Sequence, residues 1–183
     1  MKKQLLIIGI TMMLIAVSLG GCLESNMQEE GIVVLGNGMS HGDSPQNGII
    51  DKGDIVYYGE ISNKSDIITW VQGITIDYEK YGDYGDVILF NAMNDSSMQI
   101  IHRAMCWMEY HEEYGTYSVK DYGIVNVSNI TITEFGLDKY MSNNSGFITR
   151  GDKNPICAQA SGVCSEPVKL EWVIGKIVKL QDK

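Results

Sequence analysis

The apolar residues of this chain come in short runs rather than in the long periodic stripes that helices need. The runs are rich in β-branched and aromatic residues, and Gly, Asn and Asp stand between them. They cover residues 32–35, 55–58, 87–90, 100–105, 124–127, 147–149 and 173–178. Because turn-formers between short β-prone runs mark strand ends, the pattern predicts a mainly β domain. One short helical turn is predicted within residues 62–72.

The N-terminal 22 residues have the layout of a secretion signal: two lysines, an apolar run over residues 5–19, and small residues that end at Cys22. Residues 19–22 resemble a lipobox, in which Cys22 would be lipidated. The alternative is an uncleaved anchor, slightly shorter than the roughly 20 residues that span a bilayer. Both place the rest of the chain on the extracytoplasmic face of the cell membrane. We therefore expect a signal or anchor (1–22), a tether (23–31) and one β domain (32–183).

The positions of asparagine and cysteine residues also bear on whether the domain lies outside the cytoplasm. Five N-x-S/T acceptor patterns are typical of an external domain; they begin at Asn63, Asn94, Asn126, Asn129 and Asn143. Cys157 and Cys164 are close enough in sequence to close a small loop by a disulfide in an oxidising compartment, which would leave Cys106 unpaired. Alternatively, all three thiols are reduced and Cys106 is a small buried apolar residue.

Charge and motif content exclude several classes of function. The net charge of −9 and the pI near 4.7 argue against nucleic acid as a partner, since such binding needs clustered Lys and Arg. His41, His102 and His111 have no thiol or carboxylate at metal-ligand spacing, so no metal site and no cofactor are predicted. The acidic residues within 77–86 fit no calcium-loop signature, and we interpret them as a solvated turn.

Four groups of segments occur in the same order as the conserved segments of a known protein family. They are residues 33–39 with 52–56, 84–88 with 100–104, 146–154, and 166–168 with 172–176. In these segments, over most of the domain, the chain resembles the archaeal and endoplasmic-reticulum type of signal peptidase I. The resemblance implies a signal-peptidase-like β fold, a membrane as partner, and the site of a serine peptidase that removes leader peptides.

The resemblance also assigns the catalytic positions. In this family a serine attacks the peptide carbonyl, a histidine takes its proton, and an aspartate orients the imidazolium. The histidine matches His102, whose pKa we expect near neutrality. The nucleophile position is Gly38 and the aspartate position is Ala158, while Asp152 matches an earlier aspartate of the same box. Because glycine cannot form an acyl-enzyme, only about a thousandfold to ten-thousandfold acceleration over water would remain.

The leading hypothesis is therefore a catalytically impaired, membrane-tethered protein that still binds signal-peptide-like or other extended segments. Such binding adds a strand to a sheet edge and needs backbone groups rather than a nucleophile. We expect it around Gly36, Asn37 and Met39 and at the strand before His102. There are two other hypotheses. One is the active enzyme described in the next paragraph, and the other is a surface glycoprotein that keeps the fold only as a scaffold.

The rival hypothesis is an active signal peptidase with a displaced nucleophile. Ser40 lies two residues after Gly38, about 6–7 Å away in an extended segment, so a local bulge would have to redirect it. An oxygen of Ser40 or Ser44 about 3 Å from the His102 ring would support this hypothesis. Asp152 is then the candidate for orienting His102 in place of the missing aspartate.

Overall fold

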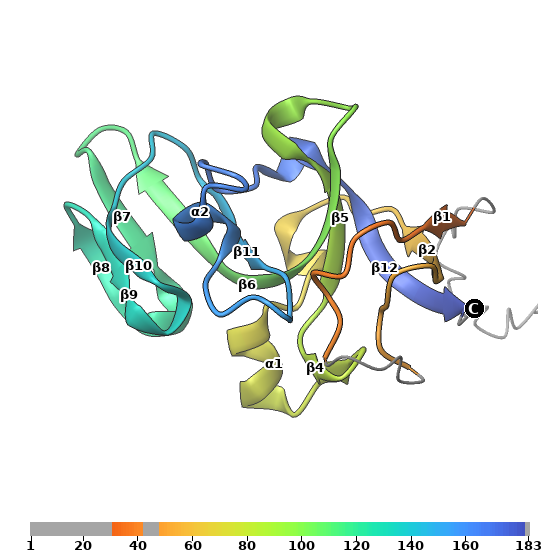
Figure 1. The fold of residues 1–183 in the computed structure, drawn as a ribbon. Helices are drawn as coiled ribbons and strands as arrows, with labels where there is room; N and C mark the ends of the chain where they lie inside the picture. Colours follow the sequence, from red (N-terminus) through yellow and green to blue (C-terminus); the bar gives the residue numbers. More distant parts are fainter. Residues whose placement is uncertain (1–30, 42–47, 182–183) are drawn as a thin grey trace, which may run out of the picture.

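The chain folds into a mainly β structure, as predicted from the short apolar runs (Figure 1). The structure, a computed structural model, describes residues 31–41 and 48–181. The signal or anchor at 1–22, its Cys22, the tether up to residue 30, and Ser44 lie outside the described residues. Within the described ranges, no helix combines the length and the apolar character needed to cross a bilayer.

The main sheet has eight strands, all paired antiparallel, in the order β1-β2-β12-β5-β6-β7-β8, with β11 added to β6. The strands are β1 (Ile32–Val33), β2 (Ile55–Gly59), β5 (Val87–Asn91), β6 (Gln99–His111), β7 (Thr116–Val119), β8 (Ile124–Val127), β11 (Gly146–Arg150) and β12 (Val173–Gln181). Two small hairpins pair β3 (Glu79–Lys80) with β4 (Asp83–Tyr84) and β9 (Ile130–Ile132) with β10 (Leu137–Tyr140). In Figure 1, β7 to β10 lie at the left, and β1, β2 and β12 at the right.

Helices are few. They are α1 (Trp70–Ile76), α2 (Ala158–Ser161) and the 3-10 turns η1 (Lys64–Asp66), η2 (Ala92–Asn94), η3 (Lys120–Tyr122), η4 (Thr133–Phe135) and η5 (Leu170–Trp172). A capping box starts α1: Thr69 Oγ1 accepts from the Gln72 N–H at 3.3 Å, and Gln72 Oε1 accepts from the Thr69 N–H at 3.2 Å. The expected turn within 62–72 is thus η1, while α1 begins at its end and continues beyond it.

Strand β6 organises the molecule. It is longer than the predicted run 100–105, because buried and half-buried residues continue to His111. Residues 99–103 of β6 pair with β5, residues 103–108 pair with β11, and residues 109–111 pair with β7. Buried side chains of β6 contribute to two of the three apolar clusters of the core, through Met105 in one and Ala104 in another. His102 therefore lies near the start of a long strand whose middle residues pair with neighbouring strands and pack in the core.

Asp86 corrects the interpretation of residues 77–86 as a solvated turn. Its side chain is fully buried and accepts hydrogen bonds from the Ile68 N–H at 2.9 Å and the Tyr78 hydroxyl at 2.9 Å. The Lys176 ammonium lies 3.2 Å from the same carboxylate. Asp86 therefore ties the segment before α1 and strand β12 to the start of β5.

We expect Asp86→Asn to lower the free energy of unfolding by about 2–3 kcal/mol, because the amide cannot balance the Lys176 ammonium and presents a donor where an acceptor is needed. Urea unfolding followed by circular dichroism measures the change. The matched control is Asp77→Asn, at the exposed C-cap of α1 with a φ of 56°, where asparagine is tolerated. Equal stability of the two variants would contradict the role given to Asp86.

Candidate functional site

Gly38 faces the imidazole of His102. It lies in a turn closed by the Ser40 N–H, which donates to the Asn37 carbonyl at 3.3 Å. A Cβ atom built on Gly38 would lie 4.0 Å from His102 Nε2, and no other described atom outside its chain neighbours comes within 4 Å. The backbone φ of Gly38 is not in the left-handed region, so a side chain here meets no backbone strain. A hydroxyl one bond beyond that Cβ lies within hydrogen-bond reach of the ring.

Burial controls the charge of His102. The residue is only 6% exposed, and desolvation lowers the pKa of its imidazole to about 4, against the opposing attraction of the Asp152 carboxylate. The expected pKa near neutrality is therefore wrong for the folded chain. His102 Nδ1 is buried and has no hydrogen-bond partner among the described residues, and the Phe90 ring packs edge-on at 6.2 Å between centroids. The ring is a neutral base without an orienting carboxylate.

Asp152 does not orient His102, in contrast to the role considered from the sequence. Its carboxylate binds the guanidinium of Arg103, at 2.8 Å from Nε and 2.5 Å from Nη2, and also lies 2.9 Å from His41 Nε2. Both Arg103 and Asp152 are almost completely excluded from solvent. The reason is the strand register: Arg150 pairs with Arg103, so the residues just after β11 meet the Arg103 side chain instead of its neighbour.

The same loop holds the turn that carries Gly38. The Lys153 N–H donates to the Gly38 carbonyl at 2.9 Å. A Cβ on Gly151 would lie only 2.6 Å from that carbonyl oxygen, so the close approach needs glycine at 151. Asp152, between these two residues, joins Arg103 of strand β6 to His41 just after the turn. Asp152 is therefore a positioning residue for the pair Gly38 and His102.

The two other catalytic candidates do not complete a triad. Ser40 is buried, at 5% exposure, and no hydrogen bond within the described ranges joins its hydroxyl to the His102 ring. Ser40 thus lacks the hydrogen bond to His102 that the displaced-nucleophile hypothesis requires of it. Ala158 starts α2 and is buried in the same apolar cluster as Phe90, the ring that packs against His102. Position 158, to which the resemblance assigned the aspartate, therefore carries only a buried methyl group.

A groove of about 320 Å³ runs past this pair. Most of its lining comes from two segments, the stretch from β1 to the Gly38 turn and the first part of β6. The lining residues are Ile32, Val33, Val34, Leu35, Gly36, Gly38, Met39, Leu89, Gln99, Ile100, Ile101 and His102. Gly36 and Met39 were both predicted to bind substrate. Asn37 was predicted too, but it does not line the groove and instead closes the turn through its carbonyl.

The groove lies between two backbone edges, and within the described residues each has hydrogen-bonding groups that pair with no other strand. Strand β1 is one end of the sheet, and the N–H of Val34, the residue after it, donates to the Asp54 carbonyl at 2.9 Å, on the β2 side. Since backbone groups alternate along an extended strand, those of Leu35 point to the other side. On β6, β11 pairs only from Arg103 onward, so residues 99–102 are paired on the β5 side alone within the described sheet.

The three cysteines in the described ranges are free thiols. Cys157 and Cys164 do not form the disulfide considered from their spacing, and Cys106 is also free and fully buried. Desolvation raises the pKa of all three thiols, which keeps them protonated. Among the described side chains, no group of three or more His, Cys, Asp or Glu is placed to hold a metal ion.

Comparisons of the chain with protein-family models, with curated proteins and with solved structures found no match. Only the residues and the geometry of this chain therefore bear on its function.

We expect the His102 imidazole to stay neutral down to about pH 4 in an NMR titration of its ring resonances. In the unfolded chain the ring takes up a proton near pH 6.5. Because the folded-state pKa is the lower one, the unfolded state binds more protons between these values, and stability falls as the pH drops through this window. The total loss is on the order of 3 kcal/mol, and His102→Gln should remove it. A ring that titrates near pH 6.5 in the folded chain would refute the burial argument.

Proposed function

We propose that this protein is a signal-peptidase-like binding protein that holds extended polypeptide segments, such as signal peptides, and does not cleave them with a nucleophile of its own. The proposal includes the signal-peptidase-like β fold and an N-terminal lipid or transmembrane anchor within residues 1–22, which keeps the domain at the outer face of the membrane. The observation that carries it is the groove beside His102, which has two unpaired backbone edges and a glycine where a nucleophile would stand.

The strand edges at β1 and at residues 99–102 support binding of an extended segment by backbone pairing. The main sheet runs from β1 through β2, β12 and β5 to β6 and continues to β7 and β8, and β1 and the first part of β6 both line the groove. An extended segment between them can pair with β1 on one side and with residues 99–102 on the other. Backbone pairing supplies affinity with little dependence on sequence, while alternate side chains enter the apolar lining around Val34, Leu89 and Ile101. Apolar, extended leader-like segments fit this lining.

The chemistry of the site supports the absence of cleavage. Acyl transfer needs an alcohol next to the base and a group that stabilises the imidazolium as it forms. Position 38 provides no alcohol, and His102 Nδ1 has no acceptor beside it. Burial further penalises the charged imidazolium, since it already lowers the pKa of His102 to about 4. A bound peptide would therefore remain intact.

The test is binding of a fluorescent leader-like peptide, extended and apolar with small residues near its end, to the full chain in a non-ionic detergent. Fluorescence anisotropy should show saturable binding, and mass spectrometry should recover the peptide uncut. Leu35→Pro removes one backbone N–H on the groove side without breaking the Val34 bond to β2, so we expect affinity roughly three- to tenfold weaker than in Leu35→Ala.

Leu35→Ala is the matched control, because it removes the same exposed side chain and keeps the backbone donor. No saturable binding, or equal affinity in the two variants, would argue against an added strand at this edge. Release of cleaved peptide by the unchanged chain would argue against the loss of proteolysis.

A further inference from the structure

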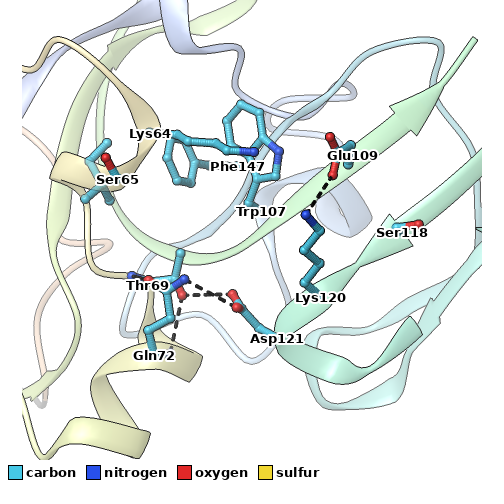
Figure 2. A pocket seen from close by; sticks show the side chains of 11 residues that line it. Lys64, Ser65, Thr69, Gln72, Trp107, Glu109, Ser118, Lys120, Asp121 and Phe147 are labelled. Carbon is cyan, nitrogen blue, oxygen red and sulfur yellow. Dashed lines mark hydrogen bonds and ion pairs between the residues drawn. The ribbon is translucent and has the colours of Figure 1, made fainter. Parts of the chain in front are cut away.

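A second cleft, of about 300 Å³, lies away from the groove and shares none of its lining residues (Figure 2). It forms where the segment from η1 to α1 meets the middle of β6, the end of β7 and η3. Its lining residues are Lys64, Ser65, Ile67, Thr69, Gln72, Trp107, Glu109, Ser118, Lys120, Asp121 and Phe147. The proposed function above does not use this cleft.

One end of the cleft is aromatic. The Trp107 and Phe147 rings pack edge to face, with centroids 4.8 Å apart. The Lys64 ammonium sits over the Trp107 ring at 4.8 Å from the centroid, which is within the range of a cation–π contact. Figure 2 shows Lys64 beside these two rings. Lys64 itself is exposed, so its flexible side chain can leave the ring at little cost. The face of Trp107 thus already holds an ammonium group supplied by the chain.

The less exposed charged groups of the cleft are carboxylates. Asp121 is fixed by the Thr69 hydroxyl at 3.2 Å and the Gln72 amide at 3.3 Å, both neutral donors that leave its negative charge unbalanced. The Glu109 side chain is 34% exposed, and its partner Lys120, at 3.9 Å, is 82% exposed. The ammonium groups of the cleft therefore belong to exposed side chains, while Asp121 is held in place by neutral donors.

From this arrangement we infer that the cleft binds an organic cation, the ammonium or guanidinium of a basic polypeptide side chain, and that Lys64 occupies the site as an internal substitute. An aromatic face with fixed carboxylates nearby attracts a cation by the ring quadrupole and by charge. The indole Nε1 of Trp107 is buried and has no hydrogen-bond partner among the described residues.

The test is a titration of the full chain, in a non-ionic detergent, with N-acetyl-lysine methylamide. The readout is the Trp107 indole N–H resonance, assigned by its disappearance in Trp107→Phe. We expect a saturable shift with the lysine derivative and none with N-acetyl-norleucine methylamide, which has the same apolar stem without the charge. Lys64→Ala removes the internal competitor and should tighten binding about two- to fivefold, as expected for an exposed cation–π contact.

The matched control is Lys179→Ala, which also removes one ammonium from over a ring, 5.1 Å from the Tyr57 centroid, but not in the cleft. Its affinity should equal that of the unchanged chain. The inference is overturned if norleucine and lysine derivatives shift the resonance alike, if neither shifts it, or if Lys64→Ala does not tighten binding. It is also overturned if N-acetyl-glutamate methylamide binds and Lys64→Ala abolishes that binding, since the cleft would then be an anion site.

Discussion

The buried ion pair of Arg103 and Asp152 is the interaction on which the geometry of the groove depends. The Arg103 guanidinium donates to the Asp152 carboxylate and to backbone carbonyls from Lys80 to Gly85, so it joins the loop after β11 to the turn between α1 and β5. Removing one partner of such a pair leaves an uncompensated buried charge, at a cost of about 3–5 kcal/mol. Because Arg103 is the neighbour of His102, and the Asp152 loop binds the Gly38 turn, this pair holds Gly38 opposite the His102 ring.

This arrangement separates binding from catalysis in physical terms. The groove keeps what an extended ligand needs, namely free backbone edges on β1 and β6 and an apolar lining. A serine peptidase would need an alcohol and a carboxylate in addition, and the proposed positions 38 and 158 carry neither, since they are Gly38 and Ala158. Backbone pairing at the groove does not depend on these two side chains, so the proposed binding without cleavage needs no change in the sheet edges.

The sequence predicted the strands best where apolar β-branched residues gather, as in β5, β8 and β12. It missed β7 and β10, whose residues include Ser118 and Lys139, because short strands with polar side chains resemble loops. The approach of Gly38 to His102 followed only from the family resemblance. The partners of Asp152 did not follow at all, since a contact between residues 103 and 152 is set by the register of β11 on β6 and leaves no local pattern. Asp86 was misjudged because the burial of one carboxylate in an acidic run depends on contacts with Tyr78 in the same segment and with Lys176, which is distant in sequence.

The most direct test of the account is covalent labelling with a fluorophosphonate probe, which reacts with an activated serine. The unchanged chain should show no adduct by mass spectrometry, whereas Gly38→Ser should acquire one probe per chain at position 38, since a hydroxyl there comes within reach of His102 Nε2. A second substitution, His102→Ala, should abolish that adduct. Labelling of the unchanged chain that disappears in Ser40→Ala would contradict the account, because the chain would then possess the nucleophile that the geometry denies it.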